Sequence, residues 1–344
     1  MKAVLYDTHG GPEVLRYVDV ADPEPGPGDV VLRVEATALN RLDIVQRAGY
    51  FTMPGFSLPH IAGMDVAGTV VLVGEATENV SVGDRVVVDP SMSGVREDSR
   101  LAGRGDLYGE LGILGATADG GYAELCLAPA GHVFPIPDGM GFDEAAVFPT
   151  CWMTAAHALF DVGGLQAGET VLIHAAGSGV STAGIQLARA AGATVLATAG
   201  SDEKCARAEE LGAAATANNR TTDVAAWARR VTGGAGVDMV FDHVGPALWE
   251  ASMFSLGARG RLVNVGNTTG DSVTIPSLGH LFHMGLHIIG SDPYRPEEFG
   301  PVWEQYCNGE FVAPVDSVMP LAEAAAAQER MLAGDLFGKI VLRP

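Results

Sequence analysis

The segment 171–200 carries the residue pattern with the clearest chemical use. A short apolar run at 171–173 meets a turn of small residues, which contains Gly177, Ser178, Gly179 and Val180. Apolar residues at helical spacing follow, and then a second strand-like run at 194–199. Strand, glycine turn and helix in this order place unpaired N–H groups and the helix dipole where a dinucleotide pyrophosphate can bind. The pattern therefore predicts a dinucleotide site at residues 177–180.

The glycine pattern alone has limited specificity. Gly177 and Gly179 begin like the G-x-G-x-x-G fingerprint, but Thr182 and Ala183 stand where a third glycine is sought. An ordinary tight turn between a strand and a helix is the alternative. The position of the turn, directly after a strand and before a helix, favours the dinucleotide interpretation.

Composition restricts the class of protein and its partners. A length of 344 residues suits two domains, and 47% hydrophobic residues with 45 glycines indicate a globular chain. The net charge of −21 argues against nucleic acid and anionic membranes as partners. The only lysines are Lys2, Lys204 and Lys339, so few cations are available to hold a phosphate-rich ligand. Four cysteines without a C-x-x-C pair favour a reducing, cytoplasmic location.

Two kinds of pattern follow one another along the chain. The N-terminal part has short strand-like segments at 3–6, 30–36, 66–73, 85–88 and 122–127, with an irregular insertion at 89–121. A helical segment is expected at 143–160. A strand–helix alternation follows, with strands expected at 171–175, 194–199, 214–218, 237–242, 260–265 and 287–291. This alternation predicts an α/β fold with a doubly wound, parallel six-stranded sheet. Two helical stretches, 296–309 and 321–333, and a last strand, 339–342, are expected to return to the N-terminal domain.

The whole chain resembles the medium-chain dehydrogenase/reductase superfamily. The resemblance is carried by the motifs ALNRLD, PHIAGMDVAGTVV, DGGYAEL, GVDMVFDHVG, GRLVNVG and GKIVL, spread from end to end, of which ALNRLD is expected to form a turn. It implies a GroES-like, mostly β domain at 1–128, completed by 292–344, and a Rossmann domain at 129–291. It also implies a homodimer built by pairing the edge strand 287–291 of two copies. Ile288 and Ile289 make that edge apolar, which an unpaired edge strand avoids.

Within the superfamily, the chain is most similar to the zinc-free quinone oxidoreductase and enoyl reductase branch. Zinc-dependent members carry Cys, His and Cys at three positions that match Asn40, Met64 and Thr150 here. Amide, thioether and hydroxyl groups are poor zinc ligands, so we expect no metal site. Leu42 matches the proton-relay hydroxyl of those enzymes. The insertion 89–121 has the length of the family's structural-zinc lobe but no cysteine, and a partner-binding loop is its alternative reading.

The end of the second strand of the dinucleotide unit indicates which cofactor is used. NAD-specific relatives have an acidic residue where this chain has Ala199. Gly200, Ser201 and Lys204 leave room and a cation for a 2′-phosphate, and Arg220 is a second candidate cation. One charged hydrogen bond contributes about 1.5–3 kcal/mol, so we expect NADPH rather than NADH. The negative charges of Asp202 and Glu203 oppose this expectation. The alternative is that both residues begin the next helix, where the helix dipole favours acids.

The resemblance also indicates residues for hydride transfer. Asn40 is expected at the floor of the substrate cleft, where its amide can donate to a carbonyl oxygen, and Tyr50 is a second donor or proton source. The remaining positions are expected at the cofactor: Arg41 at the pyrophosphate, and Thr154, Asn264, Gly266 and Asn267 near the nicotinamide. The alternatives are a turn residue for Asn40, a surface residue for Arg41 and a core aromatic for Tyr50.

Three functions remain open at this point. An NADPH-dependent reductase of quinones or α,β-unsaturated carbonyl compounds needs no metal, because its small-molecule acceptor is already polarised. A zinc-type alcohol dehydrogenase with unusual ligands is the second. A non-enzymatic NADPH-binding protein is the third.

Overall fold

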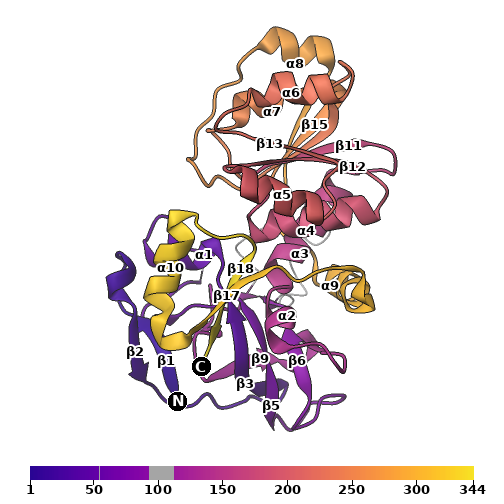
Figure 1. Cartoon of the computed structure of the whole chain (residues 1–344). Helices are drawn as coiled ribbons and strands as arrows, with labels where there is room; N and C mark the ends of the chain where they lie inside the picture. Colours follow the sequence, from indigo (N-terminus) through magenta and orange to yellow (C-terminus); the bar gives the residue numbers. More distant parts are fainter. Residues whose placement is uncertain (54, 93–111) are drawn as a thin grey trace. The chain divides into compact units, whose positions relative to one another are not determined.

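The computed structural model describes residues 1–53, 55–92 and 112–344, which form two compact units (Figure 1). The first unit comprises Met1–Thr150 and Arg295–Pro344, and the second comprises Cys151–Tyr294. The sequence placed these divisions after residues 128 and 291. The difference arises because α2 (Phe142–Ala146) packs on the sheet of the first unit, against β3 and β5. Most of the insertion 89–121 lies outside the described residues.

The second unit contains the predicted doubly wound parallel sheet. Its strands are β11 (Thr170–Ile173), β12 (Thr194–Ala199), β13 (Ala215–Asn218), β14 (Val237–Asp242), β15 (Leu256–Asn264) and β16 (His287–Gly290). They lie in the order β13-β12-β11-β14-β15-β16, and all neighbours are parallel. The order reverses between β11 and β14, the point where such sheets bind ligands at the carboxyl ends of their strands.

Helices cover both faces of this sheet, as Figure 1 shows. They are α4 (Gly179–Ala190), α5 (Asp202–Glu210), α6 (Val224–Val231), α7 (Trp249–Ser255) and α8 (Leu278–Met284). Leu172, Leu196 and Leu262 project from the strands into a core that Trp227 of α6 and Met253 of α7 complete. Since both faces are covered, the central strands are almost entirely apolar.

The first unit is mostly β, as expected. Its largest sheet has the order β10-β6-β5-β3-β18-β17, with β9 also paired to β3. These strands are β3 (Asp29–Ala38), β5 (Asp65–Val73), β6 (Arg85–Val88), β9 (Leu125–Pro129), β10 (Val133–Pro135), β17 (Val315–Pro320) and β18 (Lys339–Arg343). The last strand does return to the N-terminal domain, because β18 pairs antiparallel with β3.

Two small sheets and several helices complete the first unit. The small sheets are formed by β1 (Lys2–Tyr6), β2 (Arg16–Asp19) and β4 (His60–Ile61), and by β7 (Ser91–Met92) and β8 (Gly112–Ile113). The C-terminal helices are α9 (Pro296–Gln305), which a π-turn at Tyr306–Glu310 extends, and α10 (Ala324–Ala333), which packs on β17 and β18. No helix in the described ranges has the length and apolar character that crossing a membrane requires.

Two local predictions need correction. The motif ALNRLD, read as a turn, contains the start of a helix, α1 (Arg41–Arg47). The Asp43 carboxylate caps this helix by accepting the N–H of Asn40 at 2.8 Å. The single helical stretch expected around 143–160 is divided into α2, α3 (Pro149–Ala156) and a π-turn at His157–Val162. Pro149 begins α3, since proline fits the first turn of a helix and not its interior.

Candidate functional site

Four polar side chains form a buried cluster in the first unit. The ammonium group of Lys339 donates to Oδ1 of Asn40 at 2.6 Å and to Oδ2 of Asp65 at 2.9 Å. The other Asp65 oxygen accepts from the backbone N–H of Thr150 at 2.9 Å and from its hydroxyl at 2.5 Å. Asn40 and Lys339 are each 5% exposed and Asp65 is fully buried. The cluster therefore holds a fixed cation beside an amide group.

The register of three strands brings these residues together. Ala38 at the end of β3 lies opposite Asp65 at the start of β5. On the other side of β3, the N–H of Leu39 donates to the backbone oxygen of Ile340 at 3.0 Å. Asn40 follows Leu39, two residues after the end of β3, and lies beside the first residues of β5 and β18.

The cluster does not fit a zinc ion. The Asn40 amide oxygen and both Asp65 oxygens already accept hydrogen bonds, and the Thr150 hydroxyl donates its proton to Asp65. Met64, the third matching position, offers a buried thioether. Zinc sites in proteins are built from thiolate, imidazole or carboxylate groups with free lone pairs. The Lys339 ammonium occupies the Asn40 oxygen, and its positive charge opposes a second cation beside it.

A second buried acid, Asp43, is hydrogen-bonded to the backbone of Asn40. Oδ2 of Asp43 accepts from the backbone N–H of Asn40 at 2.8 Å and from the Tyr122 hydroxyl at 3.0 Å. Its Oδ1 has no hydrogen-bond partner within the described residues. Burial raises the pKa of the Asp43 carboxyl to about 6, although the hydrogen bonds from Asn40 and Tyr122 oppose this shift.

The structure places two other predicted residues of α1 and its following loop at the surface. Tyr50 is 86% exposed, so its alternative as a core aromatic is wrong. Arg41, the first residue of α1, is also exposed, and its guanidinium is free of ion pairs among the described residues. Neither side chain contacts the Asn40 cluster through a hydrogen bond that the described residues show. Their catalytic and pyrophosphate roles remain predictions.

In the second unit, the predicted dinucleotide turn joins β11 to α4. Ser178 is the residue before α4, and Gly179 and Val180 form the first turn, all half-buried, while Gly177 is buried. The turn is tight: the N–H of Ser178 donates to the oxygen of Ala175 at 2.8 Å, and Ala175 has a φ of 50°. A non-glycine residue in this left-handed region is strained, which is common where a turn serves a ligand. The first N–H groups of this helix suit a phosphate group.

The end of β12 forms a second part of this half-site. Ser201 precedes α5 and caps it, because its hydroxyl accepts the N–H of Lys204 at 3.3 Å. The exposed Arg220 lies over Gly200, where a methyl group would come within 3.3 Å of Nε. Asp202 and Glu203 lie in the first turn of α5, as expected, where the helix dipole stabilises acids. The arrangement brings the Arg220 guanidinium to the residue that follows β12.

The loop after β15 is held by its own amide groups. Asn264 donates from Nδ2 to the oxygens of Asp242 at 3.3 Å and Gly266 at 2.8 Å. Asn267 donates to Asp271 at 3.0 Å. Asn264 therefore shapes the loop, and its predicted contact with a nicotinamide ring stays a prediction. Thr154 is half-buried on α3, and no hydrogen bond of its side chain appears among the described residues.

Sequence reasoning missed a buried network behind the dinucleotide turn. Nδ1 of His174 lies 2.8 Å from the Thr198 hydroxyl, and Nε2 lies 3.0 Å from the Ser252 hydroxyl. Asp242 accepts the N–H groups of Val244 and Gly245 at 2.7 and 3.0 Å. Burial lowers the pKa of His174 to about 4, although the nearby Asp242 charge raises it. The available signal was the placement of His174, Thr198 and Asp242 at or just after the carboxyl ends of adjacent strands.

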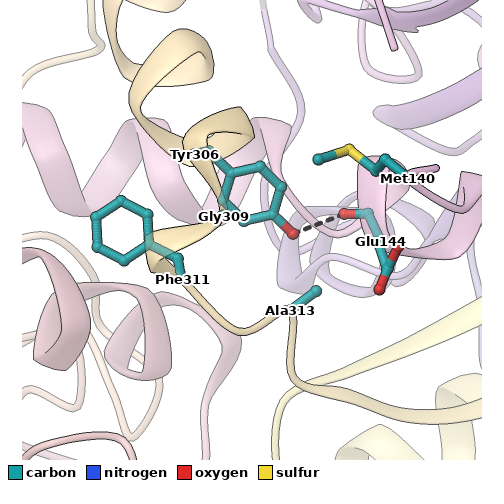
Figure 2. A pocket seen from close by; sticks show the side chains of 6 residues that line it. All are labelled: Met140, Glu144, Tyr306, Gly309, Phe311 and Ala313. Atoms are coloured by element: carbon teal, nitrogen blue, oxygen red, sulfur yellow. Dashed lines mark hydrogen bonds between the residues drawn. The ribbon is translucent and has the colours of Figure 1, made fainter. Parts of the chain in front are cut away.

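A small hollow in the first unit lies apart from these residues (Figure 2). Its volume is about 200 Å³, less than the roughly 300–1,000 Å³ of typical ligand sites. The hydroxyl of Tyr306 donates to the backbone oxygen of Glu144 at 2.8 Å across it. Its lining residues are Met140, Glu144, Tyr306, Gly309, Phe311 and Ala313. Since its central hydroxyl is satisfied internally, we assign it no ligand.

Comparison with known proteins gives matches over the whole chain. A family profile described as alcohol dehydrogenase GroES-like domain matches residues 26–138, and one described as zinc-binding dehydrogenase matches residues 179–307. The chain is 32% identical to a quinone oxidoreductase of Pseudomonas aeruginosa, over 100% of this chain and 99% of the relative. The crystal structure of an NAD-dependent alcohol dehydrogenase is 38% identical, with a TM-score of 0.94 and complete coverage of both chains. The Escherichia coli quinone oxidoreductase complexed with NADPH is 27% identical, with a TM-score of 0.84 and complete coverage.

Proposed function

Because the chain belongs to the medium-chain dehydrogenase/reductase superfamily, we propose that it is an NADPH-dependent reductase of quinones or α,β-unsaturated carbonyl compounds. The observation that carries this proposal is the cluster of Lys339, Asn40 and Asp65. Asn40 stands at a position that the resemblance assigns to a zinc ligand, and the buried Lys339 ammonium donates to its amide oxygen. Such a site suits an acceptor that is already polarised and needs no Lewis acid.

The acceptor needs only a hydrogen-bond donor for its oxygen. NADPH, when bound, supplies a hydride and becomes NADP⁺. Hydride addition would move an electron pair of the acceptor onto its carbonyl oxygen, and a proton from solvent would complete the reduced product. Asn40 donates from Nδ2 to that oxygen and stabilises its negative charge. Tyr50 is the second donor we propose, because its exposed phenol is open to a substrate.

We propose that the second unit holds the cofactor through three groups of residues. Gly177, Ser178, Gly179 and Val180 present the start of α4 to the pyrophosphate. Ser201, Lys204 and Arg220 hold the 2′-phosphate at the end of β12. The last residue of this strand is Ala199, so no carboxylate at that position repels the phosphate. Thr154, Asn264, Gly266 and Asn267 approach the nicotinamide.

An alcohol dehydrogenase is the second candidate function. It is favoured by the 38% identity to a solved NAD-dependent alcohol dehydrogenase. The Lys339 cluster argues against its zinc-dependent form, because an amide, a thioether and a hydroxyl stand at the matching positions and a cation already binds the amide oxygen. Metal analysis of the purified protein separates the two, since stoichiometric zinc together with alcohol oxidation would contradict the reductase proposal.

We also propose a homodimer through β16. This strand is the edge of the sheet, and Ile288 on it is 40% exposed. Two further apolar side chains, Leu278 and Phe282 on α8, are 70% and 69% exposed. An exposed apolar edge favours pairing with a second copy. Light scattering after size-exclusion chromatography tests this, and a monomeric mass would contradict it.

The reductase proposal is tested by oxidation of NADPH at 340 nm with a panel of acceptors. The panel contains 1,4-benzoquinone, 1,4-naphthoquinone and 3-penten-2-one, with ethanol and NADP⁺ as the reverse probe. We expect turnover with a quinone or the enone and none with ethanol. NADPH binding without turnover of any acceptor would favour the third function, a cofactor-binding protein without enzyme activity.

A further inference from the structure

We infer that Lys339 is a positioning residue that fixes the orientation of the Asn40 amide, so that the amide nitrogen donates to the oxygen of the acceptor. The inference rests on the proposed function, in which Asn40 touches the acceptor. Lys339 itself touches neither acceptor nor cofactor in this scheme. It acts through the one hydrogen bond that it donates to Oδ1.

The chemistry of the two groups determines which end of the amide faces Lys339. An ammonium group has three donors and no acceptor, so only the amide oxygen can accept from it. At 2.6 Å, a flipped amide would place its own N–H groups against a positive charge. The amide nitrogen is therefore the end that remains for another partner. Its one acceptor among the described residues is the oxygen of Ala38, at a long distance of 3.4 Å.

The ammonium is itself held in place. Asp65 accepts from it at 2.9 Å and is fully buried, and Thr150 engages the opposite carboxylate oxygen twice. Lys339 is only 5% exposed, so its charge has little access to water. A buried charge with a buried partner is strongly confined, because removing either group leaves the other uncompensated.

The same contact strengthens Asn40 as a donor. A cation on the amide oxygen draws electron density from the amide and makes its N–H groups more acidic, as in other polarised hydrogen-bond chains. The negative charge that forms on the acceptor oxygen is then stabilised by a donor that is already oriented. The chain thus keeps a positive charge beside the positions that the resemblance assigns to a metal.

A double-mutant cycle tests this inference with 1,4-naphthoquinone as the acceptor. The variants are Lys339→Met, Asn40→Ala and both together. We expect each single change to lower kcat roughly tenfold to a hundredfold, with KM for NADPH unchanged within about twofold. Because Lys339 acts through Asn40, the double variant should lose no more than the worse single variant. Losses that multiply would overturn the inference, because they would show independent roles.

Matched variants separate positioning from folding. Lys339→Met leaves Asp65 buried without its cation, so Lys339→Met with Asp65→Asn is made as a neutral pair. We expect this pair to regain thermal stability and to keep the low kcat, whereas recovery of kcat with stability would overturn the inference. Arg343→Met removes a cation from the same strand, which pairs with Asp143 at the surface, and should leave kcat unchanged.

A spectroscopic readout is independent of activity. In protein labelled with ¹⁵N-asparagine, the side-chain amide signal of Asn40 is assigned by its absence from Asn40→Ala. We expect this signal to shift and its protons to exchange faster with water in Lys339→Met, and not in Arg343→Met. An unchanged signal in Lys339→Met overturns the inference. Absence of turnover by the wild-type protein with every acceptor refutes the proposed function instead.

Discussion

The hydroxyl of Ser181 lies 2.8 Å from Nε2 of His243 and 2.7 Å from the backbone oxygen of His174. A hydroxyl carries one proton, which it donates to the backbone oxygen, so its own oxygen accepts from Nε2–H of His243. Ser181 belongs to the first turn of α4, and His243 follows β14 directly. The hydrogen bond between Ser181 and His243 therefore connects the start of α4 to the end of β14, the strand at which the order of the sheet reverses.

Ser181→Ala should loosen this connection. The change leaves the N–H of His243 and the oxygen of His174 without their partner, at a cost of about 1–3 kcal/mol of unfolding free energy. The start of α4 becomes less well ordered, so we also expect weaker NADPH binding. Urea unfolding and titration of NADPH fluorescence measure the two effects. Ser291→Ala is the control, since among the described residues that hydroxyl donates to the adjacent Asp292 oxygen alone. Equal stability of both variants would contradict the prediction.

Changes at the end of β12 should alter the choice of cofactor. Lys204→Ala removes a cation from the first turn of α5, and Arg220→Ala removes the guanidinium beside Gly200. Each change should reduce kcat/KM for NADPH about tenfold to a hundredfold. NADH has no 2′-phosphate, so its kcat/KM should change little. Arg230→Ala removes an exposed cation from α6 and should leave the ratio of the two cofactors unchanged. A wild-type preference for NADH would contradict the premise.

The strands of the second unit could be predicted from the sequence, because each one is marked by a pattern within its own residues. Buried parallel strands appear as continuous apolar runs, so 171–173 and 237–241 were recognisable without any knowledge of their neighbours. The strands β2, β4, β10 and β17 were not predicted. Each is short or only partly buried, so neither an apolar run nor a clear alternation distinguishes it.

The candidate site was only partly predictable, because it is built from residues that lie far apart in the sequence. Asn40 could be named from its motif, but its partner Lys339 lies 299 residues away in the sequence. Such contacts are created by strand register, here of β18 on β3, which no local pattern specifies. The network around His174 was missed likewise, because its members come from three strands and a helix.

Asp43 should make the first unit more stable in mild acid. Burial raises the pKa of its carboxyl to about 6 from the ordinary 3.8, and Tyr122, Lys339 and Asp65 are the other ionisable groups acting on it. Between these values the folded state binds more protons than the unfolded state, so the contribution to stability rises as pH falls through 6. Above pH 6 the buried anion costs about 3 kcal/mol.

Asp43→Asn tests this statement, because the amide keeps an oxygen for Asn40 and Tyr122 and carries no charge. We expect this variant to exceed the wild-type unfolding free energy at pH 8 and to match it near pH 4. The exposed Glu75→Gln is the control and should follow the wild-type curve. An Asp43→Asn variant that is less stable than wild type at pH 8 would count against the argument.

His174 should give the second unit the opposite pH dependence. Burial lowers its pKa to about 4, while Asp242 and His243 are the charged or titratable groups beside it. In the unfolded chain, His174 binds a proton below about pH 6.5, whereas in the folded state it binds one only below about pH 4. The free energy of unfolding therefore falls as the pH falls between these values, by about 3 kcal/mol in all.

His174→Gln keeps a donor and an acceptor for Thr198 and Ser252 and removes the titration. Hydrogen exchange of peptides from 151–294, corrected for intrinsic rates, should show acid-induced opening in wild type and not in this variant, and parallel opening in both would refute the assignment.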